Sequence, residues 1–116
     1  MSDKNSAGPQ APHNANANLE EPMREICLRA IDHFGTEHQK WKLVEELGEL
    51  LVEIAREHTG RGDKEAIREE LADATIMCEQ MRIVYGYRDV GAWIERKLAR
   101  LWRLMRLPEG RRPGHD

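Results

Sequence analysis

The chain has few aromatic residues and only two cysteines. Phenylalanine occurs once, tyrosine twice and tryptophan three times among 116 residues, so a hydrophobic core must be built mainly from aliphatic side chains. Cys27 and Cys78 lack the paired spacing of a disulfide framework or a zinc site. Both fall at apolar helical positions, so we expect them to be small core residues in a reducing compartment.

Long apolar runs are also absent. No stretch approaches the roughly 18 apolar residues that a membrane span requires, and the polar N-terminus does not resemble a secretory signal. The sequence shows no β-type alternation of apolar and polar residues. A net charge of -3 and a pI near 6.0 argue against a duplex-binding protein. We therefore expect a cytoplasmic, all-α protein that binds neither membranes nor duplex nucleic acid.

Helical patterning is confined to the middle of the chain. Residues 1–18 are rich in Asn, Ala and Pro and predict a disordered arm, and residues 108–116 predict a disordered tail. Between them, residues 19–107 predict one helical domain. The first helix is expected over about 20–34 and the fourth over about 89–107. Between them, we expect a second helix from an N-cap at Thr36 to about 58 and a third from an N-cap at Asp63 to about 84. Short turns favour antiparallel neighbours, so we predict an antiparallel bundle of about four helices.

The second helix carries acids in an unusual place. Its apolar stripe consists of Leu43, Leu47, Leu50, Leu51 and Ile54. The stripe is bordered by a row of charged residues, namely Lys42, Glu46, Glu49 and Glu53. Charges that only solubilise a helix usually lie opposite its core. An acidic row beside the buried stripe therefore predicts a bound cation.

The third helix repeats this anomaly. Its expected buried arc consists of Ile67, Leu71, Ala74, Cys78 and Met81. Glu70 and Asp73 fall within or beside that arc, where carboxylates are costly unless they are paired, protonated or bound to a metal. Because residues three apart are neighbours on a helix, these two acids form a two-pronged oxygen site, as Glu46 and Glu49 do. If the two helices pair, the four acids can face one another.

The fourth helix has the widest apolar face. Its stripe consists of Val90, Ile94, Leu98, Leu101 and Met105. Trp93 and Trp102 lie on opposite flanks of that stripe, so the face predicts contacts with more than one neighbour. We expect both tryptophans to anchor a core or an interface.

Converging carboxylates predict a hard divalent cation. Carboxylate oxygens with water suit Mg²⁺ or Mn²⁺, and no Cys or His lies within the acidic cluster to favour zinc. Mg²⁺ is typically completed by substrate phosphates, which points to phosphate-ester chemistry. Glu45 and Glu53 are spare acids that could accept a proton from an attacking water.

The two acidic pairs resemble the MazG family of all-α nucleoside triphosphate pyrophosphohydrolases. Glu46-x-x-Glu49, twenty residues, then Glu70-x-x-Asp73 are set in EELGELL and EELADATIM. The likeness covers about 39–105 and includes a K-L-x-R-L run that begins at Lys97. It implies that a nucleoside or deoxynucleoside triphosphate is hydrolysed to monophosphate and pyrophosphate with Mg²⁺. It further implies a homodimer or homotetramer with sites between subunits, as in short, single-domain MazG-like members.

The resemblance also assigns roles to residues. The implied metal ligands are Glu46, Glu49, Glu70 and Asp73. Lys97 and Arg100 match a basic position in the family's last helix, where they would neutralise the outer phosphates. Candidate contacts to the base, from their position at the mouth of the acidic row, are Trp41, Gln39 and Lys42.

Two other readings were weighed against this one. A ferritin-like carboxylate bundle requires Glu-x-x-His, and no histidine in the chain has a glutamate three residues before it. A non-catalytic helical oligomer would act as a nucleotide-binding or regulatory interaction module, with Lys97 and Arg100 pairing with the acids instead of a metal. The intact set of four acids favours the enzyme, because drift after loss of catalysis would remove carboxylates.

Overall fold

The computed structural model describes residues 20–106, in which every regular element is an α-helix and no strand occurs. The helices are α1 (Glu20–Phe34), α2 (Thr36–His58), α3 (Lys64–Val84) and α4 (Tyr87–Met105). The all-α prediction is therefore confirmed. None of these described helices combines the length and apolarity needed to cross a bilayer. The predicted arm at 1–18 and tail at 108–116 lie outside the described residues.

The helix ends follow local sequence signals with two exceptions. The Asp63 cap of α3 is confirmed, because the backbone N–H of Glu65 donates to Asp63 Oδ1 at 3.0 Å. The expected Thr36 cap is wrong: α2 begins at Thr36, and Gly35 occupies the capping position without a side-chain hydrogen bond. α4 begins at Tyr87 rather than at residue 89, because the turn before it is shorter than expected.

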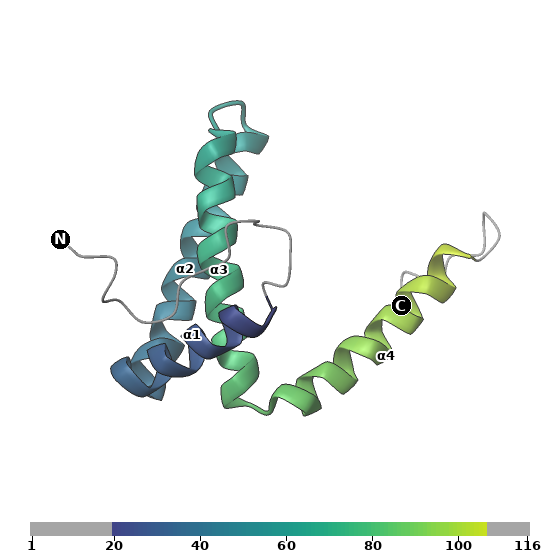
Figure 1. Cartoon of the computed structure of the whole chain (residues 1–116). Helices are drawn as coiled ribbons and strands as arrows, with labels where there is room; N and C mark the ends of the chain where they lie inside the picture. The colour runs from purple at the N-terminus through teal and green to yellow at the C-terminus, as the bar shows by residue number, and fades with distance from the viewer. Residues whose placement is uncertain (1–19, 107–116) are drawn as a thin grey trace. The chain divides into compact units, whose positions relative to one another are not determined.

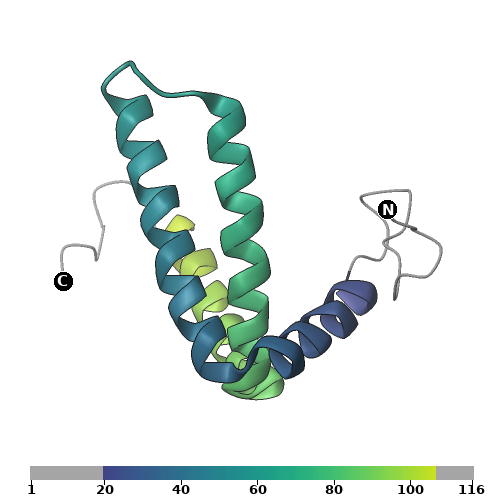
Figure 2. The same cartoon turned by 90° about the vertical axis from the view of Figure 1, so that its left-hand side faces the viewer.

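The first unit of the chain contains α1, α2 and α3. Figures 1 and 2 show α2 and α3 side by side and antiparallel, joined by the short turn at residues 59–63. α1 contacts both helices and lies at the end of the hairpin where α2 begins and α3 ends. The predicted antiparallel pairing of the two acid-bearing helices is thus present in the structure.

Buried side chains in this unit are a mixture of apolar and polar groups. The buried hydrophobic residues are Cys27, Ala74, Met77 and Met81. The Cys27 thiol donates to the backbone carbonyl of Ile76 at 3.8 Å, which joins α1 to α3. Gln39 Nε2 donates to Gln80 Oε1 at 2.7 Å, and both residues are buried. A buried polar pair therefore joins α2 to α3.

The buried face of α3 differs in part from the prediction. Ala74 and Met81 are buried as expected, whereas Leu71 is 47% exposed and Cys78 is exposed. Met77, which falls within or directly beside the expected arc, is also buried. The expected core position of Cys78 is therefore wrong. α3 carries apolar side chains on several sides, so periodicity alone does not select the side that packs against α1 and α2.

The apolar stripe of α2 is largely exposed. Leu47, Leu51 and Ile54 are 44%, 71% and 47% exposed, although all three were expected to be buried. The buried residues of α2 are Gln39 and Glu46. Because the acidic row borders the apolar stripe, a small rotation of α2 about its axis is enough to bury part of the acidic row in place of the stripe. The hairpin therefore buries a carboxylate and leaves leucines in solvent.

The described part of the second unit consists of α4, and none of its residues is buried. Its exposed apolar side chains are Trp93, Ile94, Leu98, Leu101, Trp102 and Met105. The Arg96 guanidinium lies 4.5 Å from the ring centroid of Trp93, and that of Arg106 lies 5.5 Å from the ring centroid of Trp102. Such cation–π contacts cover part of each ring. The predicted wide apolar face is present and exposed.

Replacement of Gly35 by alanine should destabilise the fold. Gly35 has φ 93° and ψ 147°, a backbone region that is essentially restricted to glycine. We expect Gly35→Ala to lower the free energy of unfolding by about 1 to 3 kcal/mol in urea titrations. Gly48→Ala is the control, because an added Cβ inside α2 would meet nothing within 4 Å. It should raise stability by up to about 1 kcal/mol. Equal effects would contradict this role of Gly35.

Candidate metal centre

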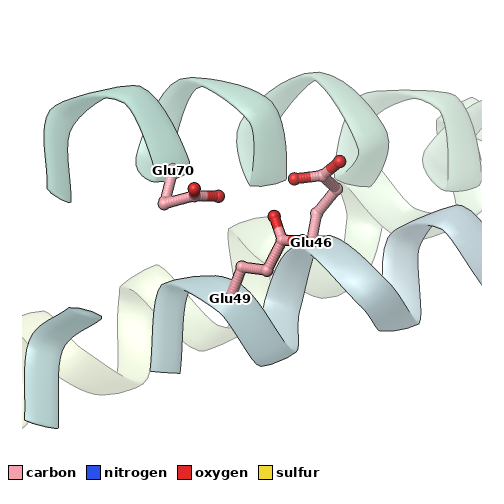
Figure 3. A group of neighbouring side chains, drawn as sticks. All are labelled: Glu46, Glu49 and Glu70. Carbon is pink, nitrogen blue, oxygen red and sulfur yellow. The ribbon is translucent and has the colours of Figure 1, made fainter. Parts of the chain in front are cut away.

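Three glutamates converge between α2 and α3. Figure 3 shows Glu46 and Glu49 from α2 and Glu70 from α3 pointing into the space between the helices. Each offers a carboxylate oxygen, and these oxygens all lie within 4.8 Å of one another. The three-residue spacing places the two α2 acids on one face, and the antiparallel partner brings the third opposite them. The structure thus brings together three of the four acids predicted as ligands.

The cluster contains buried oxygens that lack a partner. Glu46 is 8% exposed, and its Oε1 accepts no hydrogen bond within the described structure. Oε1 of the half-buried Glu70 is also buried without a hydrogen-bond partner. A carboxylate oxygen removed from water is costly unless it is protonated, hydrogen-bonded or bound to a cation. These orphaned oxygens therefore fit a small cation bound between the helices.

Burial and mutual repulsion raise the pKa of two of the acids. For Glu46, burial is the largest cause, followed by the negative charges of Asp73 and Glu49, while Lys42 opposes the rise in pKa. For Glu70, burial is again the largest cause of the raised pKa, followed by the charges of Glu49, Glu46 and Asp73 and by a side-chain hydrogen bond to Glu49. Both effects disfavour the ionised carboxylates and are relieved by a positive charge among them.

Asp73 lies outside the group of three. It is exposed on α3, yet its charge contributes to the raised pKa of both Glu46 and Glu70. Coulombic influence of this kind requires proximity. Asp73 therefore borders the cluster from its solvent side, three residues along α3 from Glu70.

Lys42 pairs with two consecutive acids on its own helix. Its Nζ lies 3.4 Å from Glu45 Oε1 and 3.5 Å from Glu46 Oε2. The pKa of Lys42 is raised, first by its hydrogen bond to Glu45, then by the charges of Glu45 and Glu46. Glu45 is exposed, whereas the Glu46 side chain is only 10% exposed. A charged amine thus lies at the edge of the acidic cluster.

Two open hollows lie along the acidic row of α2. The first has a volume of about 360 Å³ and is lined by Glu37, His38, Trp41, Lys42 and Glu45. The second has a volume of about 630 Å³ and is lined by Glu45, Gly48, Glu49, Val52, Glu53 and Glu70. Trp41 is 69% exposed, so its ring face is accessible. Gly48 and Val52 were not predicted to line a site, although a glycine inside a helical pattern signals open space or close approach.

Gln39 is not at the surface. It is 4% exposed, and its Nε2 donates to Gln80 Oε1 at 2.7 Å. Its Oε1 lies 2.7 Å from Nδ1 of His38. The sequence suggested Gln39 as a contact to a base because of its proximity to the acidic row. In the structure, both ends of its amide are engaged within the protein.

The predicted phosphate-binding residues belong to α4. Lys97 and Arg100 are both exposed on that helix. The Nζ of Lys97 lies 5.9 Å from the ring centroid of Trp93, so the amine is drawn towards the aromatic face. Because α4 forms its own unit, the role of these two residues towards phosphates stays a prediction.

Protein-family models, curated proteins and solved structures were compared with the chain, and none of them matches it. The resemblance to the MazG family therefore stays a prediction. The candidate metal centre rests on its own geometry, above all on the buried oxygens of Glu46 and Glu70.

The metal-free protein should lose stability as the pH rises. Glu46 and Glu70 have pKa values raised above their ordinary 4.5, so the folded state holds their protons more tightly than the unfolded state does. The stability that these bound protons contribute is complete below the pKa of the two glutamates in the unfolded chain. It is lost as the pH rises through their higher pKa in the folded protein. Urea unfolding in EDTA, from pH 4.5 upward, should show this decline.

Glu70→Gln should flatten that decline, because it removes one titrating group and one of the repelling charges. Glu69→Gln, on the exposed neighbour of Glu70, is the matched control and should keep the wild-type slope. A stability that increases with pH over the same range, in the absence of metal, would contradict the repulsive character of the cluster.

Proposed function

We propose that this chain is a Mg²⁺-dependent nucleoside triphosphate pyrophosphohydrolase. It would convert a nucleoside or deoxynucleoside triphosphate and water to the monophosphate and pyrophosphate in the cytoplasm. The observation that carries the proposal is the convergence of Glu46, Glu49 and Glu70 from two antiparallel helices, with buried oxygens that lack partners. The MazG resemblance of these same residues supplies the reaction.

The donor set supports Mg²⁺, with Mn²⁺ as a substitute. The group within the described residues consists of three carboxylates and contains no histidine or cysteine. Oxygen donors of this kind suit hard cations that keep several waters and bind phosphate oxygens as well. When bound, Mg²⁺ supplies positive charge that neutralises phosphate oxygens and favours ionisation of the attacking water.

The acidic side chains have two proposed roles, metal binding and proton acceptance. Glu46, Glu49 and Glu70 would hold the cation through their converging oxygens. By the MazG resemblance, Asp73 would be the fourth ligand. Glu45 is exposed beside the cluster and accepts the proton of the attacking water. Among residues 20–106, no Ser, Cys or His lines the hollow next to the cluster, so we propose that water attacks directly without a covalent intermediate.

The substrate is held by residues around the acidic row. Trp41 presents an exposed ring for stacking on the base, and Lys42 lines the same hollow. Gln39 does not reach this hollow but holds His38, which lines it. Lys97 and Arg100 of α4 neutralise the outer phosphates, as charged donors do at phosphoryl centres.

We further propose that the chain acts as a homodimer or homotetramer, in a MazG-like antiparallel bundle of about four helices. The buried hydrophobic residues of the described chain are few, namely Cys27, Ala74, Met77 and Met81. Large apolar side chains on α2 are exposed, including Val44 at 55% and Leu51 at 71%. Contiguous apolar surface of this kind marks an interaction site. Burial against further copies would give these leucines the core that one chain lacks.

The second candidate is a nucleotide-binding or regulatory module without catalysis. It is favoured by the ion pair between Lys42 and Glu46, which neutralises part of the cluster without a metal. Such a module would form the same oligomer and bind nucleotides, but it would release no pyrophosphate.

Glu49→Gln should abolish turnover while the helices remain folded. We expect pyrophosphate release to fall by at least about 100-fold, the loss typical of a group that stabilises charge in a transition state. The assay measures pyrophosphate released from a panel of standard and modified triphosphates, with Mg²⁺ and with EDTA. Glu69→Gln removes an equal charge from the exposed side of α3 and should retain wild-type activity.

The outcomes of this assay separate the two functions. Full activity of Glu49→Gln would show that the site is elsewhere. Release of pyrophosphate from none of the triphosphates, by a folded protein that binds nucleotides, would favour the module.

The assembly is tested by light scattering after size-exclusion chromatography. We expect a mass of two or four times the 13.4 kDa chain. Leu51→Glu places a charge in the exposed apolar stripe of α2 and should shift the protein to monomer. Thr59→Glu adds the same charge at the hairpin turn and should leave the mass unchanged. A monomeric wild-type protein would contradict the proposed assembly.

A further inference from the structure

Lys42 places a positive charge at the edge of the acidic cluster. Its Nζ lies 3.5 Å from Oε2 of Glu46, and the other oxygen of that carboxylate, Oε1, has no partner. Glu46 is also one of the three acids whose oxygens converge. One carboxylate is therefore shared between an internal cation on one side and the candidate metal centre on the other.

The cluster requires such a charge when no metal is bound. Glu46 is nine-tenths buried, and Glu49, Glu70 and Asp73 surround it with negative charge. An uncompensated charge in this environment would strongly destabilise the fold. The lysine four residues earlier on α2 supplies compensation from the same helix, without any contribution from another segment.

The Lys42 side chain is partly exposed and flexible enough to change its partner. Its side chain is 43% exposed, and a flexible four-carbon stem carries its charge. The second contact, from Nζ to Oε1 of the exposed Glu45 at 3.4 Å, gives the amine a partner that does not belong to the group of converging acids. The amine contacts both consecutive acids at once in this structure, so it can give up Glu46 and keep Glu45.

We propose that Lys42 is the internal counter-ion of the candidate metal centre: it neutralises Glu46 in the metal-free protein and leaves it for Glu45 when a divalent cation binds. The inference rests on the proposed function, since it takes Glu46 as a metal ligand. Two cations on one carboxylate repel each other, so a bound metal weakens the contact between Lys42 and Glu46, and we expect the amine to give up that contact. The displaced amine stays at the rim until the substrate binds and then turns to its anionic phosphates, which leaves Glu45 free to accept the proton of the attacking water.

The consequence is that Lys42 weakens metal binding and stabilises the metal-free fold. Mn²⁺ binding to the full chain, followed by electron paramagnetic resonance without nucleotide, measures the first effect. We expect Lys42→Met to bind Mn²⁺ about tenfold more tightly than wild type, since one close repulsive charge has been removed. Methionine retains the apolar stem, so the packing along α2 is preserved.

Lys40→Met is the matched control. Lys40 lies on the same helix and pairs with Glu37 at 3.5 Å, outside the group of converging acids. The variant removes the same unit of charge and should leave Mn²⁺ affinity within about twofold of wild type, because Lys40 pairs with none of the three converging acids.

A second measurement needs no metal. In EDTA, Lys42→Met should lower the urea midpoint of the wild-type protein, and this loss should be smaller in a Glu46→Gln background, where Lys42 retains its ion pair with Glu45 alone. The double-mutant cycle isolates the coupling between the two side chains. Equal losses in both backgrounds would show that Lys42 stabilises the helix without acting on Glu46, and the proposal would fail.

The metal titration distinguishes failure of this inference from failure of the proposed function. Mn²⁺ binding with equal or lower affinity in Lys42→Met than in Lys40→Met overturns the displacement of Lys42 and leaves the metal centre intact. A folded wild-type protein that binds no Mn²⁺ overturns the metal centre itself. If the double-mutant cycle in EDTA still showed coupling between Lys42 and Glu46, Lys42 would be a permanent salt-bridge partner of Glu46, which also excludes displacement.

Discussion

The cost of burying like charges between α2 and α3 is the constraint on which the rest of the structure depends. The buried residues of α2 are Gln39 and Glu46, and α3 buries Gln80 beside Ala74, Met77 and Met81, so polar groups and one carboxylate share the interior with apolar side chains. A carboxylate placed there must be protonated, paired or bound to a cation. Three observations on Glu46 follow from this requirement: its pKa is raised, it forms an ion pair with Lys42, and its Oε1 has no hydrogen-bond partner among the described residues.

This constraint also connects the site to the assembly. A helix has one face to turn towards its hairpin partner, and α2 turns its acidic edge. The leucine stripe is then left exposed, with Leu47 and Leu51 at 44% and 71%. The described core is small, and the exposed stripe is the surface that we propose for contact with other copies. The candidate cation site and this exposed stripe both depend on which face α2 turns towards α3.

Function and stability oppose each other in this hairpin. Acids that would bind a divalent cation repel one another without it, and the fold tolerates them because Lys42 and protonation reduce the repulsion. Sites of this kind exchange stability for binding, as functional sites in small domains often do. The buried Gln39 to Gln80 hydrogen bond offsets part of that cost, since it joins the two helices with both amides satisfied at their contact.

The sequence by itself determined the local structure: four helices with their glycine turns, the Asp63 cap, and two acidic pairs at three-residue spacing. These features follow from backbone propensity and helical period, which act between near neighbours. Only the tertiary structure decided which face of each helix is buried. The acidic row and the leucine stripe of α2 adjoin, and α3 is apolar on several sides, so periodicity was equally compatible with more than one rotation. The contacts of α2 and α3 settled it, burying Glu46 and exposing Leu51 and Cys78.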